Sequence, residues 1–196
     1  MKQTIGVLSL QGAFEKHRTV LSRLKIASKD VRYPGDLDGC DGLIIPGGES
    51  TTISNLIDTI GMRAPLLKFA EKKPVMGTCA GMILMARTVN DPRVQPLNLM
   101  NIEIARNAYG RQVDSFVSGL EVQINGKSVS LKGVFIRAPK IRSTGEEVEV
   151  LGVINGEPIF VRQNRHLATS FHPELSDTTA IHEYFLSLVR EPTLVY

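Results

Sequence analysis

Residues 41–61 read DGLIIPGGESTTISNLIDTIG, a stretch that contains a short apolar run, a glycine turn and a helical pattern in succession. The apolar run at 43–45 predicts a buried strand, because it is short and is followed at once by Pro46 and two glycines. Isoleucine and leucine then recur at helical spacing up to Gly61, which predicts a helix that ends at a glycine. A strand followed directly by a helix is the unit from which parallel sheets are built.

The same alternation of strand and helix is found on both sides of this stretch. Further strands are predicted at TIGVLSL, DVRY and PVMGTC, which begin at residues 4, 30 and 74. Further helices are predicted from residue 14, from about 63 to 72, and over AGMILMARTV at 80–89. Strands interleaved with helices indicate a parallel sheet that is covered by helices on both faces.

The second half of the chain has a different pattern. Short strands are predicted at NIEIA, LEVQING, GVFIRAP, EVEVLGVING, EPIFVRQN and LATSF. Asn-Gly pairs at 125–126 and 155–156 favour antiparallel hairpins, and TTAIHEYFLSLVR predicts a closing helix. We therefore expect a three-layer α/β/α sandwich with a mixed, mostly parallel central sheet, formed as a single domain by residues 1–196.

Composition excludes several classes of protein. With 196 residues, 42% of them hydrophobic and 22% charged, the chain is typical of one globular domain and unlike a disordered segment. A net charge of +3 without a basic block argues against nucleic acid as a partner. No apolar run approaches the roughly 18 residues that a membrane span needs. Two cysteines and an amino terminus unlike a signal peptide predict a reducing, cytoplasmic location.

The most reactive candidate is Cys79, in the string GTCAG at 77–81. A cysteine between small residues, where a strand turns into a helix, has the form of a nucleophile elbow with sulfur in place of the serine oxygen. The amino terminus of the following helix would favour the thiolate. The alternative is a structural cysteine in the core, since free cysteine is among the most buried residue types.

A thiol nucleophile needs a base, and the chain has four histidines. His17 and His182 fall in predicted helices, where solvation or packing is expected, and His166 falls in a predicted turn. His172 differs, because SFHPEL follows an apolar strand and supplies Glu174 two residues later. In an extended segment both side chains face the same side, so that Glu174 can orient the imidazole toward Cys79. A surface His-Pro turn is the alternative for this motif.

Donors for an oxyanion are predicted beside the cysteine. Gly47 and Gly48 end a strand with N–H groups that can point into a cleft, and the N–H of Ala80 adjoins the nucleophile. The alternative is an ordinary glycine turn. The cysteine, the histidine and the glycines each follow a predicted strand, and the carboxyl ends of parallel strands are where such sheets bind ligands.

These residues together resemble the class I, triad-type glutamine amidotransferases. Longer strings are similar to those of the glutaminase subunits of pyridoxal 5'-phosphate synthase: SLQGAF at 9–14, PGGESTT at 46–52, GTCAGM at 77–82, RNAYGRQVDSF at 106–116, FIRAP at 135–139 and SFHPEL at 170–175. The similarity extends from residue 5 to about 190. It implies a flavodoxin-like fold and a domain with neither a cofactor nor a bound metal.

The resemblance also implies residue roles. Cys79 would be the nucleophile, with His172 and Glu174 completing a triad. The substrate L-glutamine would contact the following residues: Gly47, Gly48, Glu49, Ala80, Arg106, Ile136 and Arg137. The ammonia released would pass to a synthase subunit, in a large hetero-oligomer, that combines it with ribose 5-phosphate and glyceraldehyde 3-phosphate.

Three other functions stay open on the sequence. The chain could serve a different synthase, such as imidazole glycerol phosphate synthase, because the triad does not identify the recipient of the ammonia. It could also use the elbow as a cysteine peptidase or redox sensor of related fold. The third alternative is an interaction module in which Cys79 belongs to the core.

Overall fold

The computed structural model describes residues 3–106 and 115–191. Its helices are α1 (Phe14–Arg23), α2 (Ser50–Thr59), α3 (Arg63–Ala70), α4 (Ala80–Met85) and α5 (Ala180–Arg190), with 3₁₀ helices η1 (Pro34–Leu37) and η2 (Pro173–Leu175). The strands are β1 (Thr4–Leu8), β2 (Ala27–Val31), β3 (Gly42–Ile45), β4 (Val75–Thr78), β5 (Ala86–Val89), β6 (Met100–Ala105), β7 (Ser115–Ile124), β8 (Lys127–Ile136), β9 (Lys140–Thr144), β10 (Glu149–Ile154), β11 (Glu157–Gln163) and β12 (His166–Thr169).

The central sheet is mixed, as the sequence predicted. Its strand order is β2-β1-β3-β4-β12-β11-β10-β7-β8, and the strands from β2 to β12 pair in parallel. The strands from β12 to β8 pair antiparallel. The two predicted Asn-Gly hairpins are present, with positive φ at Asn125, Gly126, Asn155 and Gly156. This conformation suits the primed two-residue turns that match strand twist.

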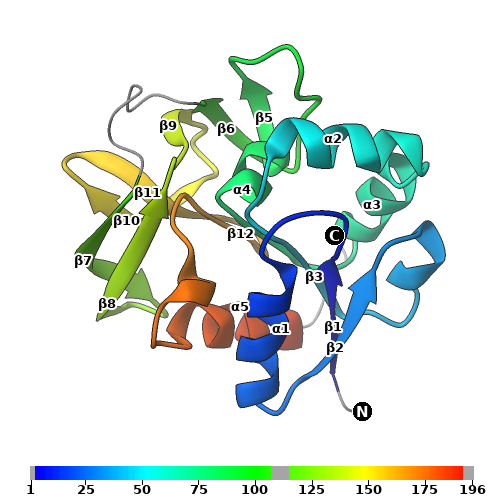
Figure 1. The fold of residues 1–196 in the computed structure, drawn as a ribbon. Helices are drawn as coiled ribbons and strands as arrows, with labels where there is room; N and C mark the ends of the chain where they lie inside the picture. Colours follow the sequence, from blue (N-terminus) through cyan, green and yellow to red (C-terminus); the bar gives the residue numbers. More distant parts are fainter. Residues whose placement is uncertain (1–2, 107–114, 192–196) are drawn as a thin grey trace.

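Helices cover both faces of the parallel strands, which gives three layers (Figure 1). Strand β3 shows how the two faces differ: Ile44 packs in one core cluster with Leu21 of α1 and Phe185 of α5. Its neighbours Leu43 and Ile45 belong to the other cluster, which contains residues of α2, α3 and α4. Because successive side chains of a strand point to opposite faces, a continuous apolar strand needs helices on both sides.

Helix α4 is shorter than the sequence predicted. It ends at Met85, whereas a helix was expected over residues 80–89. The N–H groups of residues 97–99 donate to the carbonyl oxygens of residues 84–86 at 2.7–3.1 Å, so a crossing segment occupies the acceptors that a longer helix would use for itself. Residues 86–89 instead form β5, which pairs in parallel with β6.

A second sheet, with strand order β5-β6-β9, was not predicted either. Its strand β9 has no apolar alternation, and Ile141 is the one of its five residues that is buried. The sheet lies beside the end of α4 (Figure 1). Among the described helices, none has the length and apolar character needed to span a membrane.

Candidate active site

The carboxyl ends of four neighbouring parallel strands meet at one edge of the central sheet. The strand order places β1, β3, β4 and β12 side by side. The segments that leave these strands contain residues 9–13, residues 46–49, Cys79 and residues 170–175, respectively. The topology therefore brings the predicted nucleophile, base and glycine loop to one place, at the edge where open α/β sheets bind ligands.

Cys79 has the backbone of a nucleophile elbow. Its φ is 50° and its ψ is −103°, in a left-handed region that a residue with a side chain rarely adopts. The flanking glycines are required by close packing: a Cβ at Gly77 would lie 2.6 Å from the Gly81 carbonyl carbon, and one at Gly81 would lie 2.0 Å from the Ile45 carbonyl oxygen. The small residues of GTCAG therefore permit a tight, strained turn, as the sequence predicted.

His172 and Glu174 are in direct contact. The His172 Nδ1 atom lies 2.7 Å from Glu174 Oε1, and both residues are buried. The sequence predicted this contact for an extended segment, but the backbone instead turns as η2, with the Leu175 N–H donating to the His172 carbonyl oxygen at 3.2 Å. Pro173 begins this turn because its fixed φ suits the first position of a helix.

The charge state of the imidazole is set by its two neighbours. Burial alone would lower the pKa of His172, but hydrogen bonds and charge interactions with Cys79 and Glu174 raise the pKa to about 10. Burial acts to raise the pKa of Glu174, yet its interactions with the surrounding histidines leave that pKa below the ordinary value. The group thus favours an imidazolium beside a carboxylate, which is the form that can stabilise a thiolate.

Gly47 lies against both the imidazole and the nucleophile. A Cβ on this residue would be 2.4 Å from His172 Cε1 and 3.4 Å from Cys79 Cβ. Any side chain at this position would therefore displace the imidazole. The loop at 46–49 also places Gly48 and Glu49 at the same cavity.

A second loop holds the glycine loop in place. The Ala13 N–H donates to the Gly47 carbonyl oxygen at 2.9 Å, and the Glu49 N–H donates to the Gln11 side-chain oxygen at 2.8 Å. Gly12 has a φ of 100°, and a Cβ on it would be 2.0 Å from the Gly47 carbonyl oxygen. The string SLQGAF therefore fixes the conformation of the PGGES loop.

Charged groups line the side of the cavity away from the imidazole. Arg106 pairs with Glu49 Oε1 at 2.8 Å and with Asp91 Oδ2 at 2.6 Å. The other carboxylate oxygen of Glu49 caps α2 by accepting from the Thr52 N–H at 3.0 Å. Hydrogen bonds from Thr51 and Thr52 and the charge of Arg106 outweigh burial and lower the pKa of Glu49. Glu49 is therefore held as a carboxylate and pairs with the Arg106 guanidinium.

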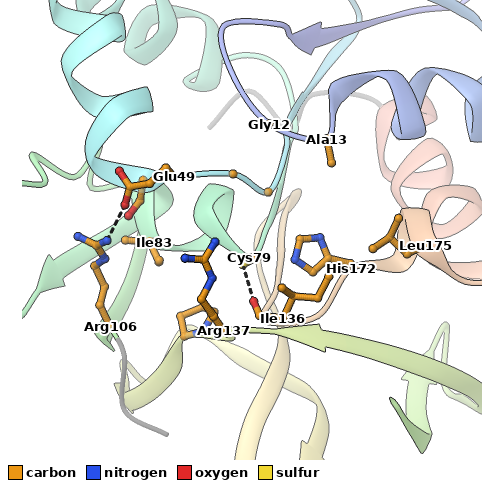
Figure 2. A pocket seen from close by; sticks show the side chains of 14 residues that line it. Gly12, Ala13, Glu49, Cys79, Ile83, Arg106, Ile136, Arg137, His172 and Leu175 are labelled. Atoms are coloured by element: carbon orange, nitrogen blue, oxygen red, sulfur yellow. Dashed lines mark hydrogen bonds and ion pairs between the residues drawn. The ribbon is translucent and has the colours of Figure 1, made fainter. Parts of the chain in front are cut away.

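The cavity measures about 250 Å³. It is lined by Gly12, Ala13, Gly47, Gly48, Glu49, Ser50, Cys79, Ile83, Arg106, Ile136, Arg137, Pro139, His172 and Leu175. Figure 2 shows Cys79 between the Glu49–Arg106 pair and His172, with the Ile136 carbonyl oxygen facing the sulfur at 3.8 Å. Arg137 follows with a φ of 44°, a second strained residue beside the sulfur.

Most of the residues predicted from the sequence therefore meet at one cavity. Ala80 adjoins Cys79 but does not line the cavity, and Glu174 lies behind His172. Sequence reasoning assigned no role to several lining residues, although the similarity of SLQGAF and PGGESTT pointed to three of them: Gly12, Ala13 and Ser50. Except for Arg106 and the terminal Ser115 and Phe116, the string RNAYGRQVDSF lies outside the described residues.

Two histidines have surroundings that the sequence did not reveal. His17 and His182 were expected to be solvated or to pack, yet both side chains are fully buried and in polar contact with each other. His17 also lies 3.4 Å from Glu174. Helical periodicity predicted that His17 shares a face with apolar residues, but no local pattern indicates a partner that is more than 150 residues away.

Within residues 3–106 and 115–191, no group of three or more His, Cys, Asp or Glu side chains has an arrangement that could hold a metal ion. The histidines and Glu174 instead contact one another in a row, in the order His172, Glu174, His17 and His182. A thiol, an imidazole and a carboxylate in that order can carry out nucleophilic acyl transfer.

Known proteins with similar sequences cover nearly the whole chain. Residues 7–191 match the SNO glutamine amidotransferase family. A pyridoxal 5'-phosphate synthase subunit PdxT of Thermosipho africanus is 46% identical over 188 residues, which are 95% of this chain and 99% of that protein. The protein of the same name in Francisella tularensis is 44% identical over 96% of this chain and 100% of its own length.

Solved structures agree with this assignment. One described as a glutamine amidotransferase superimposes with a TM-score of 0.89 at 45% identity, over 94% of this chain and 98% of its own. PurLQS from Thermotoga maritima has a TM-score of 0.70 at 14% identity, covering 97% of this chain and 100% of its own, which supports the fold alone. The chain belongs to the SNO glutamine amidotransferase family.

Proposed function

We propose that this chain is the glutaminase subunit of a pyridoxal 5'-phosphate synthase, in which it hydrolyses L-glutamine to L-glutamate and ammonia. The observation that carries the proposal is Cys79, held at a positive φ beside the His172–Glu174 pair in a chain of this family. The relatives named as synthase subunits supply the identity of the complex.

The cavity suits a free amino acid. At about 250 Å³ it lies near the lower end of small-molecule sites. Glu49 offers a carboxylate to an α-ammonium group, and Arg106 and Arg137 offer guanidinium groups to an α-carboxylate. We assign the backbone of Gly47, Gly48 and Ile136 to the rest of the substrate. In this proposed arrangement the side-chain amide of glutamine lies at Cys79.

The first half of the reaction forms a thioester. The Cys79 thiolate attacks the amide carbon, and the oxyanion that forms accepts hydrogen bonds from the N–H groups of Ala80 and of the glycine loop. His172 gives its proton to the amide nitrogen as the carbon–nitrogen bond breaks. Ammonia leaves, and a γ-glutamyl thioester with a neutral His172 remains.

The second half hydrolyses the thioester. Neutral His172 takes a proton from water, the hydroxide attacks the thioester carbon, and the carbon–sulfur bond breaks. The γ-carboxylic acid of the product loses its proton to solvent as glutamate is released, and the Cys79 thiolate and the His172 imidazolium are restored. Glu174 stabilises that imidazolium in both halves of the reaction.

The ammonia requires a shielded route to its acceptor. In bulk water at neutral pH it is largely protonated and no longer a nucleophile, so we propose that it passes directly to the synthase subunit. We further propose that the two subunits form a large hetero-oligomer and that residues 1–196 act in it as one glutaminase domain. The two cysteines, both free, support a cytoplasmic location.

The decisive experiment is a glutaminase assay of wild type and Cys79→Ala, each alone and with the synthase subunit. We expect weak activity alone, strong activation in the complex, and none above background for Cys79→Ala. A γ-glutamyl adduct on Cys79, trapped with a glutamine analogue, would exclude a peptidase. Undiminished hydrolysis by Cys79→Ala would overturn the proposal, and equal turnover with and without the partner would refute activation in the complex.

A further inference from the structure

A buried chain of polar contacts ends on the far side of Glu174. The His182 Nε2 atom lies 3.0 Å from His17 Nδ1. The His17 Nε2 atom lies 3.2 Å from Thr78 Oγ1 and 3.4 Å from Glu174 Oε2. Helix α1 thus brings His17 to the carboxylate that orients His172, and α5 brings His182 to His17, both from behind the cavity and without lining it.

The two oxygens of Glu174 have different surroundings. Oε1 contacts His172 Nδ1 at 2.7 Å, whereas Oε2 accepts no hydrogen bond from any residue that the structure describes. The Glu174 and His17 side chains are both fully buried, and His17 Nε2 lies 3.4 Å from Oε2. A buried carboxylate oxygen without such a neighbour would strongly favour the protonated acid.

The direction of the proton on His17 follows from its neighbours. If Nε2 carries the proton, it donates to Thr78 and turns the positive end of an N–H dipole toward Glu174. His17 Nδ1 then accepts from His182 Nε2, and the unpartnered His182 Nδ1 is only a lone pair. The opposite tautomers would aim a lone pair at the carboxylate and leave a buried N–H of His182 without an acceptor, which is the more costly arrangement.

Both of these histidines are neutral. Burial lowers the pKa of His182 to about 3, and it lowers the pKa of His17 by more than Glu174 raises it. Glu174 therefore lies between a neutral imidazole, His17, and the one that carries charge, His172. If His17 were charged it would compete with His172 for the carboxylate, so its neutrality leaves the proton on the catalytic side.

We propose that His17 is a positioning residue of the reaction: its Nε2–H, held by Thr78 and oriented by His182, keeps Glu174 ionised and aimed at His172. This inference rests on the proposed glutaminase function. It also gives a role to Thr78, the strand residue before the nucleophile, because its hydroxyl connects the elbow to the His17–His182 pair. His17 touches no reacting atom.

Two amide substitutions distinguish the roles of the two imidazole nitrogens of His17. In His17→Gln the side-chain N–H₂ reaches about as far as Nε2 and can face Glu174. In His17→Asn the shorter amide reaches only about as far as Nδ1, so it keeps the contact with His182 and loses the one with Glu174. Both remove the ring and leave a buried amide, so they are matched controls for packing. Each is assayed in the complex with the synthase subunit.

We expect His17→Asn to lower kcat about tenfold to hundredfold, by analogy with the loss of outer hydrogen-bond partners of metal-binding histidines. His17→Gln should retain kcat within about threefold of wild type. KM for glutamine should change less than twofold in both, because His17 does not line the cavity. The alkaline limb of kcat/KM should move to lower pH in His17→Asn. Cys79 and Glu174 are the groups that face His172, and a less fully ionised Glu174 stabilises its imidazolium less.

The outcomes are distinguishable. Equal kcat for folded His17→Asn and His17→Gln, with unchanged pH limbs, would overturn the inference while an active wild type still supports the proposed function. A wild type without glutaminase activity would overturn both. If thermal unfolding shows that His17→Asn is not folded, the isosteric Thr78→Val gives the same test: kcat reduced at least threefold with KM unchanged supports the inference, and wild-type kinetics contradict it.

Discussion

The two cysteines of this protein are almost equally inaccessible, yet their surroundings differ completely. Cys40 is 3% exposed and Cys79 is 7% exposed. The Cys40 thiol donates to the Asp36 carbonyl oxygen at 3.4 Å, and burial, aided by nearby carboxylates, raises its pKa. Cys79 has a strained backbone and a protonated imidazole beside it. Burial alone therefore does not identify a reactive thiol; the charge of its neighbours does.

The packing around the two thiols differs as well. A Cβ on Gly6 would lie 3.0 Å from Cys40 Sγ, so this sulfur fills space within the core. The glycines around Cys79 instead allow backbone segments to approach and leave the sulfur at the wall of a cavity. The sulfur atom is thus a packing atom at Cys40 and a candidate nucleophile at Cys79.

The largest expected difference is in catalysis. Cys79→Ser should lower kcat of the assembled enzyme by at least about 10³-fold, because the hydroxyl is a much weaker nucleophile than the thiolate. Cys40→Ser should leave kcat within twofold. Steady-state glutamate release by the two variants measures both effects. A comparable loss in the two variants would mean that the distinction between the thiols is wrong.

The next largest difference in kcat is expected from glycine substitutions near the two cysteines. Gly47→Ala should reduce kcat about 10²-fold, because a Cβ 2.4 Å from His172 Cε1 displaces the imidazole. Gly35→Ala, in the turn before Cys40, has no atom within 4 Å of the added Cβ and should leave kcat within twofold. Wild-type kinetics for Gly47→Ala would show that the imidazole can occupy another position during the reaction.

The pH dependence tests the charge of the imidazole. Because the pKa of His172 is raised to about 10, its imidazolium is present below that pH and activity should fall as the pH rises through it. Glu174→Gln removes one of the groups that raises this pKa, so the alkaline limb of kcat/KM should move down by about one pH unit or more. The measurement is a pH profile of both proteins. An unmoved limb would mean that Glu174 does not stabilise the imidazolium.

The smallest expected effects are on stability, and they have opposite signs. Cys79→Gly should raise the free energy of unfolding by about 1 kcal/mol, since glycine relieves the strain at a φ of 50°. Cys40→Gly should lower it by about 1 kcal/mol or more through lost packing. Urea unfolding of the two variants gives both values. A destabilised Cys79→Gly would show that the sulfur contributes more through packing than the elbow costs in strain.

Much of the fold could be predicted because its patterns are local. The strand and helix of residues 41–61, the Asn-Gly turns and the elbow each depend on residues a few positions apart. The end of α4 could not be predicted, because segment 97–99 takes its carbonyl acceptors from outside the helix. Strand β9 was missed because its sequence, KIRST, has no apolar alternation and only Ile141 of its five residues is buried.

The candidate site, like the fold, could be predicted only where its patterns are local. The sequence by itself determined the residue types and their order: a cysteine in an elbow, a His-Pro-Glu motif and a glycine loop, each after a strand. Only the tertiary structure decided how they meet, because parallel pairing aligns the ends of β3, β4 and β12. It also brought His17 against Glu174, although 157 positions separate them in the chain. Such contacts depend on the packing of whole layers, which no short pattern encodes.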